Sequence, residues 1–186
     1  MEKLIKIKRA LISVSDKTGI VKLAQELCDR NVEIVSTGGS ASILRDAGFN
    51  VTEVSRLTGF PEMMDGRLKT LHPKVHGGLL AIRDKKSHLK AMEEYKVKEI
   101  DLLVVNLYPF AETVKAGADY AQCMENIDIG GPAMIRAAAK NFKYVATLVD
   151  IQDYEGLVNE LKMNNGCTSY SFRQKLSQNA FSLTAY

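Results

Sequence analysis

The sequence has 186 residues, a length that suits one domain. Its 46% hydrophobic and 25% charged residues are ordinary for a folded chain and exclude intrinsic disorder, collagen and a disulfide-rich scaffold. The 25 basic and 22 acidic residues leave a net charge of only +3, with Lys and Arg interspersed among Asp and Glu, so no nucleic-acid partner is expected.

Cysteine usage and apolar runs predict the compartment. Cys28, Cys123 and Cys167 are few, odd in number and far apart, which indicates a reducing environment without disulfides. No apolar stretch approaches the ~20 residues that span a bilayer, and the N-terminal run is too broken for a signal peptide. We therefore expect a cytoplasmic protein with no membrane partner.

The first half of the chain alternates strand and helix patterns. Apolar, β-branched runs predict strands at 10–14, 33–36 and 51–54. Apolar residues at helical spacing, Ile20, Leu23, Ala24 and Leu27, predict a helix after the first strand. A second helix is expected between Ser40, as its N-cap, and Gly48. This alternation indicates an α/β fold with a parallel sheet.

The second half contains two segments without periodicity, at 55–78 and 126–132. A long irregular segment inside a domain is usually functional or mobile. The remaining pattern predicts strands at 102–105 and 145–149 and helices at 86–95, 133–140, 152–163 and 169–186. No repeat or linker interrupts the chain, so residues 1–186 are expected to form a single domain.

Three unusual loops follow predicted strands, at 13–19, 37–40 and 106–109. Ligands of open parallel sheets bind at the carboxyl ends of the strands. The first two loops lead into helix N-termini, which favour anions, and Gly38 and Gly39 allow close approach of a ligand. Further donors are the Lys17 ammonium and the hydroxyls of Ser15, Thr18, Thr37 and Ser40. A phosphate fits this chemistry; the alternative is a glycine turn with hydroxyls that only cap helices.

The central segment adds cations. Arg67 and Lys69 would point to the same side of an extended segment, with Thr70 as a neighbouring donor. A solvated basic loop is the alternative. His72 and His76 have a spacing that suits metal ligands on a helix, but Pro73 opposes a continuous helix across them, so we expect no metal site.

Asp128 and Lys140 flank the Ala-rich helix predicted at 133–140. Asp128 would otherwise be a turn or capping residue, and Lys140 would otherwise compensate the helix dipole. A lysine–carboxylate pair beside a bound phosphate could move protons if the two residues met.

Five ordered motifs carry a specific resemblance. They are SVSDKTG at 13–19, TGG at 37–39, GFPEMMDGRLKTLHP at 59–73, NLYPF at 106–110 and NIDIGGPAMIRAAAKN at 126–141. Together they resemble the IMP cyclohydrolase portion of the bifunctional AICAR transformylase/IMP cyclohydrolase family, from about residue 9 to the end of the chain, with weaker agreement at 84–100, 112–124 and 152–170. The resemblance implies a methylglyoxal synthase-like fold, a Rossmann-like three-layer α/β domain whose mainly parallel sheet is flanked by helices.

The resemblance also implies a reaction. In this family 5-formamidoimidazole-4-carboxamide ribotide (FAICAR) closes its ring and loses water to give inosine monophosphate (IMP), without metal or organic cofactor. The family's second domain, which transfers a formyl group from 10-formyltetrahydrofolate, would follow Tyr186 and is expected to be absent here. Intact family members are dimeric, so a homodimer is one expected assembly.

Site residues are carried over by motif position. The nucleotide, chiefly its 5′-phosphate, is expected to contact Ser15, Asp16, Lys17, Thr37, Gly38, Gly39, Ser40, Arg67, Lys69 and Thr70. The residues implied to line the base are Asn106, Leu107, Asp128 and Ile129. Lys140 is implied as proton donor or acceptor, with Lys69, Tyr108 and Asp128 orienting the amide and stabilising the oxyanion. Ser40 stands where many relatives have threonine, which keeps the hydroxyl.

Two other functions compete with this reading. A methylglyoxal synthase would need a carboxylate base such as Asp16 or Asp65 beside the phosphate loops. A non-catalytic nucleotide sensor, like the regulatory domain of carbamoyl phosphate synthetase, would not need Tyr108, Asp128 and Lys140 together. The motifs at 59–73 and 126–141 favour the purine enzyme.

Overall fold

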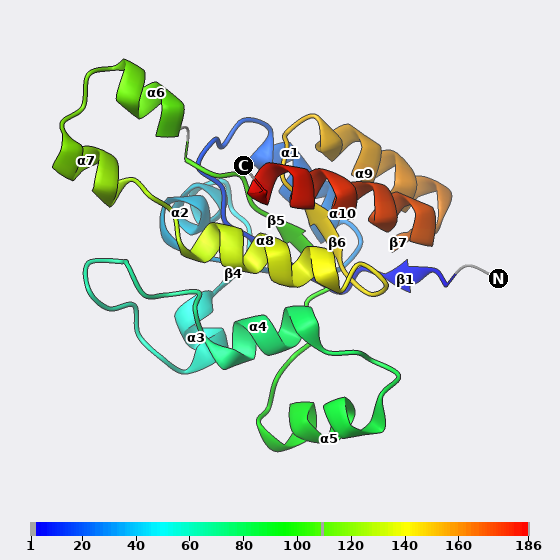
Figure 1. Ribbon diagram of the computed structural model, residues 1–186. Helices are drawn as coiled ribbons and strands as arrows, with labels where there is room; N and C mark the ends of the chain where they lie inside the picture. Colours follow the sequence, from blue (N-terminus) through cyan, green and yellow to red (C-terminus); the bar gives the residue numbers. More distant parts are fainter. Residues whose placement is uncertain (1–2, 109, 186) are drawn as a thin grey trace.

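A five-stranded parallel sheet forms the centre of the computed structural model, which describes residues 3–108 and 110–185 (Figure 1). The strands lie in the order β4-β3-β2-β5-β6. Their bounds are Arg9–Ile12 for β2, Glu33–Ser36 for β3, Val51–Glu53 for β4, Leu102–Val104 for β5 and Ala146–Leu148 for β6. Leu11 of the central strand pairs with Val35 on one side and Leu103 on the other. The predicted parallel α/β sheet is therefore confirmed.

Helices cover both faces of this sheet. The first five are α1 Ile20–Cys28, α2 Gly38–Asp46, α3 Val54–Thr58, α4 Pro73–Leu80 and α5 Lys86–Glu94. The others are α6 Phe110–Lys115, α7 Tyr120–Glu125, α8 Gly130–Lys140, α9 Asp153–Met163 and α10 Tyr170–Thr184. Figure 1 shows the resulting layers, with α5, α6 and α7 standing off from the body.

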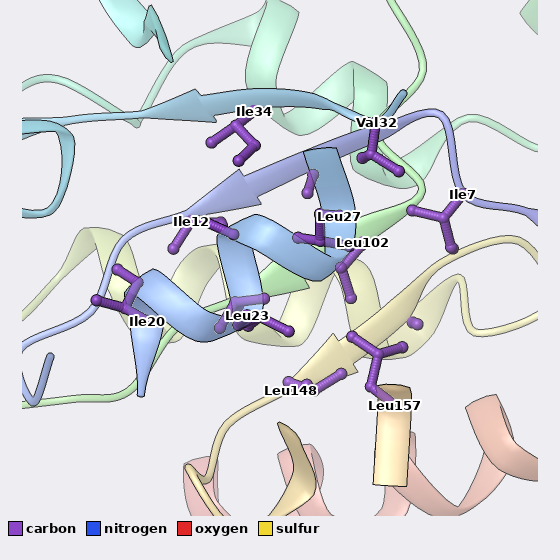
Figure 2. Close-up of a cluster of buried hydrophobic side chains, with 14 of the residues drawn as sticks. Ile7, Ile12, Ile20, Leu23, Leu27, Val32, Ile34, Leu102, Leu148 and Leu157 are labelled. Carbon is purple, nitrogen blue, oxygen red and sulfur yellow. The ribbon is translucent and has the colours of Figure 1, made fainter. Parts of the chain in front are cut away.

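Alternating strand residues face two separate hydrophobic cores. Ile12 and its neighbour in β5, Val104, lie in one core with residues of α1 and α9, whereas Leu11 and Leu103 lie in the other with residues of α4 and α8. In Figure 2, Ile20, Leu23 and Leu27 project from α1 toward the strands of the first core. Burial on both faces explains why these strands are continuous apolar runs. It also confirms the predicted three-layer architecture.

The two ends of the described chain are held together. β1 (Ile5–Lys6) pairs antiparallel with β7 (Cys167–Thr168), two short strands that the sequence pattern did not predict. The fully buried Arg173 of α10 donates to the carbonyl oxygens of Lys3 and Phe142 at 2.9 Å. These bonds satisfy a cation that would be costly to bury alone.

Several helix boundaries differ from prediction. The segment 55–78, expected to be irregular, contains α3 and α4, so only residues 59–72 lack helix or strand apart from one bridge between Met63 and Leu68. Pro73 is the first residue of α4, where its missing N–H costs nothing. α8 begins three residues earlier than expected because Gly130, Gly131 and Pro132 occupy its first turn. α6 and α7 were not predicted. Pro109 and Tyr186, parts of a predicted loop and helix, lie outside the described residues.

The topology fixes where a ligand can bind. The chain runs outward from β2 through β3 to β4, and then returns to place β5 and β6 on the other side of β2. The switch point is therefore the gap between the carboxyl ends of β2 and β5, the usual ligand crevice of such sheets. Within residues 3–108 and 110–185, no helix is long and apolar enough to cross a membrane.

Candidate functional site

Asn106 joins the loops that leave β2 and β5. Its Oδ1 accepts from the backbone N–H groups of Ser15 at 2.6 Å and Asp16 at 2.9 Å, and its Nδ2 donates to the Asp16 carbonyl at 2.8 Å. The Thr18 hydroxyl and backbone N–H lower the pKa of Asp16 by hydrogen bonding to its carboxylate. The loop at 13–19 is therefore held in shape at the switch point.

Lys17 and Lys69 both reach the start of α2. A Cβ built on Gly39 would lie 3.3 Å from Lys17 Cε, and one built on Gly38 would lie 3.8 Å from Lys69 Nζ. Gly38 also has a φ of +54°, a conformation that side chains rarely adopt. Thr37 is the N-cap of α2, and its side chain makes no capping bond to the first N–H groups of this helix. The arrangement suits an anion.

Arg67 lies in a tight turn beside this cation pair. Met63 and Leu68 form a β-bridge that closes the turn, and Met64 and Asp65 have positive φ values of 56° and 53°. Arg67 thus belongs to a turn and not to an extended segment that would present Arg67 and Lys69 on one side. Lys69 approaches Gly38, while Arg67 pairs with Glu125 of α7. Non-glycine residues with positive φ store strain, which is common at binding sites.

Asp128 lies at the N-terminus of α8. Its Oδ1 accepts from the Gly131 N–H at 2.8 Å. A Cβ on Gly131 would collide with the Asp128 carboxylate and would lie 2.8 Å from Leu107 Cδ2, so Leu107 and Asp128 pack on the same glycine. The buried Thr70 hydroxyl lies against Gly130, at 2.6 Å from where its Cβ would be. The structure therefore brings the segments around Thr70, Leu107 and Asp128 together.

Two further predicted residues border this cluster in the chain. Tyr108 follows Leu107 and is 57% exposed, and Ile129 precedes α8 and is 62% exposed. Exposure at these positions leaves both side chains open to a ligand.

Lys140 is placed differently from the other predicted residues. It is the last residue of α8, so the helix rise puts its Cα ~15 Å from that of Gly130. Lys140 is exposed. The chain after it enters β6 at Ala146, so Lys140 lies toward the amino ends of the strands, whereas Asp128 lies toward their carboxyl ends. The sequence left open whether Lys140 meets Asp128, and within this chain the two residues lie at opposite ends of α8. The position of Lys140 in the last turn suits compensation of the helix dipole.

Ser40 also has a different local role from the one expected. It lies inside α2 rather than at its N-cap, and it is buried. Its Oγ accepts from the Val14 N–H at 3.0 Å and lies 3.1 Å from the Val14 carbonyl, to which it donates. The hydroxyl therefore anchors the loop at 13–19 to α2.

A cavity of about 560 Å³ opens at the same sheet edge. Ser15, Asp16, Asn106 and Leu107 line it together with four residues that sequence reasoning missed, Val149, Asp150, Ile151 and Gln152. Because this group follows a predicted strand, the rule that singled out the other loops applies to it as well. Nearby, burial together with the charges of Asp16 and Asp150 raises the pKa of Tyr154 to about 12.

Two histidines of the central segment belong to α4 or its N-cap. His72 caps the helix, with Nδ1 accepting from the Lys74 N–H at 3.1 Å. His76 lies inside α4, and its buried Nε2 has no hydrogen-bond partner among the described residues. In the same part of the chain, no cluster of three or more His, Cys, Asp or Glu side chains could hold a metal ion.

Comparison with known proteins identifies close relatives. A family model described as "MGS-like domain" matches residues 19–133, and one described as "AICARFT/IMPCHase bienzyme" matches residues 138–186. The bifunctional purine biosynthesis protein PurH of Dinoroseobacter shibae is 63% identical and that of Ruegeria pomeroyi 60% identical, each over 185 residues that cover this whole chain. The chain spans 35% of the length of these relatives.

A solved structure shares the same fold. The structure titled "Crystal structure of ForH" superposes with a TM-score of 0.84 at 36% sequence identity, and the match covers 96% of this chain and 94% of that one. One family model thus covers more than half of the chain, and a relative of nearly equal length agrees with it in sequence and fold. The chain belongs to the MGS-like domain family and is similar, over its whole length, to the corresponding part of bifunctional PurH.

Proposed function

We propose that this chain is an IMP cyclohydrolase, which converts FAICAR to IMP. The observation that carries the proposal is the position of Lys17 and Lys69, which come from separate loops and flank the N-terminus of α2 at the edge of the sheet where Asp128 lies. The similarity to PurH supplies the substrate class, because the names of these relatives state a purine biosynthesis protein.

The 5′-phosphate of the ribotide would bind at the start of α2. The first N–H groups of this helix and the ammonium groups of Lys17 and Lys69 offer charge-assisted hydrogen bonds to a dianion. The complete proposed set is Ser15, Asp16, Lys17, Thr37, Gly38, Gly39, Ser40, Arg67, Lys69 and Thr70. Within it, the Ser40 hydroxyl acts by holding the Val14 backbone in place.

The base would lie over Leu107, Asp128 and Ile129, with Asn106 shaping the adjacent loop. Ring closure requires the carboxamide nitrogen to attack the formyl carbon, after which the formyl oxygen leaves as water. An amide nitrogen is a poor nucleophile, so a fixed near-attack geometry contributes much of the rate. Donors at the formyl oxygen stabilise the negative charge that develops there.

The proposed catalytic side chains are Lys69, Tyr108, Asp128 and Lys140. Lys69 lies beside Gly38, where the phosphate would bind, and Tyr108 and Asp128 would border the base. Lys140 enters this set by motif position alone, since its place at the far end of α8 opposes direct proton transfer within one chain.

The test is a cyclisation assay on the purified chain with FAICAR, without added metal or folate. We expect IMP to form, and Asp128→Asn to lower kcat far more than it weakens IMP binding. Absence of turnover by folded protein that still binds IMP would favour a nucleotide sensor instead. Lys140→Ala assigns the fourth residue: a kcat loss comparable to that of Asp128→Asn supports its catalytic role, and unchanged kcat removes it.

The same proposal includes the cofactor requirement of the reaction. Ring closure would need no cofactor, and use of 10-formyltetrahydrofolate would belong to the part of the PurH relatives that this chain does not match.

The compartment and the assembly are also proposed. The three cysteines are unpaired, which supports the cytoplasm as compartment. A homodimer is the proposed assembly, which sedimentation analysis of the purified chain would test.

A further inference from the structure

Arg67 is already engaged by a carboxylate. Its Nε donates to Oε1 of Glu125 at 3.1 Å, and its second guanidinium nitrogen contacts Oε2 of the same side chain. The two residues are 58 positions apart, so the contact joins the turn at 64–67 to the end of α7. Two parallel hydrogen bonds of this kind are the geometry in which a guanidinium also binds phosphate.

Glu125 belongs to a segment that stands off from the body, here called the arm and defined as residues 110–129 (Figure 1). The arm contains α6 and α7, which pack against each other. Val114, Tyr120 and Met124 expose half or more of their surface, with Tyr120 at 81%. The arm begins just after Tyr108 and includes Asp128 at its other end, so it connects two residues proposed for catalysis.

A ligand phosphate could replace the Glu125 carboxylate as the partner of Arg67 at little cost. The two side chains are 69% and 58% exposed, and ion pairs in such surroundings contribute little because solvent screens them. A ligand phosphate at the start of α2 would have stronger attraction available, since Lys17 and Lys69 would act on it together. The turn of Arg67 is close to this position, because Lys69 Nζ lies 3.8 Å from a Cβ built on Gly38 and 3.7 Å from one built on Gly66. The phosphate would also repel the Glu125 carboxylate.

We propose that Glu125 is a positioning residue that occupies Arg67 in the ligand-free chain and is displaced when the phosphate group of a ligand binds, releasing α7 from the turn at 64–67. The inference rests on the proposed phosphate site. Glu125 would thereby set the affinity of the site for the anion, and α7 of the arm would lose its contact with the turn at 64–67 when the anion binds.

Calorimetric titration with ribose 5-phosphate tests the exchange. Glu125→Gln removes the competing charge, so we expect its affinity to rise about two- to fivefold over wild type, the range open to an exposed ion pair. Glu94→Gln, the same charge change on exposed α5, controls for the net charge and should leave the affinity unchanged. The gain must disappear when Glu125→Gln is placed in an Arg67→Gln background. Affinity that does not rise, or a gain that persists without Arg67, overturns the proposal.

Hydrogen exchange supplies a second readout that a merely structural role would not give. Ribose 5-phosphate should speed amide exchange in α7 of the wild type, and Glu125→Gln should show the faster exchange without ligand. Slower exchange in α7 on binding would overturn release of the arm. The cyclisation assay is scored separately: if FAICAR is not turned over but the Glu125→Gln gain is present, the proposed reaction fails while the exchange at Arg67 stands.

Discussion

Gly131 leaves room for the Asp128 carboxylate at the first turn of α8. A Cβ on this residue would collide with the carboxylate and press on Leu107. We expect Gly131→Ala to lower kcat/KM for cyclisation at least about tenfold, because a displacement that costs ~1.4 kcal/mol at the transition state already has that effect.

The matched control for this change is Gly156→Ala in α9. A Cβ there would make an ordinary contact with Phe172 at 3.8 Å, and alanine favours a helix over glycine by about 1 kcal/mol. The control should keep full activity and gain stability. Equal activity of Gly131→Ala and wild type would contradict the proposed use of Asp128.

The hydrogen-bond partners of individual side chains could not be predicted from residue type. Ser40 and Asn106 were expected to contact the nucleotide because the resemblance carries them over by motif position. In the structure both hold the loop at 13–19 through backbone bonds to Val14, Ser15 and Asp16. A hydroxyl or amide serves either purpose equally well, so only the packing of α2 and β5 against β2 decides between them.

At the scale of single elements, α4 carries a group that should make stability depend on pH. Burial lowers the pKa of His76 from its ordinary 6.5, and its Nε2 lacks a partner among the described residues. Below pH 6.5 the unfolded chain binds a proton that the folded chain resists, so the free energy of unfolding should fall as the pH drops through the folded pKa.

Urea unfolding at pH 7.5, 6.5 and 5.5 measures this dependence. The midpoint of the wild type should decrease toward pH 5.5, and His76→Gln should flatten the decrease because the replacement does not titrate. The same slope in both proteins would place its origin in other groups.

Elements were predictable where apolar periodicity was strong. β3 matches its predicted bounds, and α1 presents the predicted apolar face, because burial selects those residues. α3, α6 and α7 are only five or six residues long, too short for a helical period to stand out. α4 was missed because glycines and a proline suggested a loop, although Pro73 occupies the one helical position that favours it.

At the scale of the whole molecule, the candidate site depends on contacts that no local pattern contains. The loops after β2, β3 and β5 come together because these three strands are neighbours, and residues 64–70 reach them from beyond β4. The βαβ pattern predicted that such loops share one edge of the sheet. It could not predict that α8 would carry Lys140 to the other edge, because the direction of a helix across a sheet is set by tertiary packing.

Because the candidate site is assembled from loops in separate parts of the chain, we expect the phosphate of the ligand to stabilise the whole fold. A ligand that bridges loops from separate parts of the chain binds only when all of them are in place, so its binding free energy adds to that of folding. At about 100 times its Kd, IMP should raise Tm by about 5–10 °C for a chain of this size. Inosine, which lacks the phosphate, should raise it much less.

Thermal unfolding of matched variants assigns the effect to the cations at α2. Lys17→Ala should lose most of the rise produced by IMP, measured against its own ligand-free Tm, because its ammonium lies beside Gly39. Lys90→Ala, the same charge change on exposed α5, should keep the rise. If both variants kept the rise in Tm, or if inosine and IMP stabilised the protein equally, the phosphate could not be bound at the N-terminus of α2. The cavity lined in part by residues 149–152 would then be the next site to test.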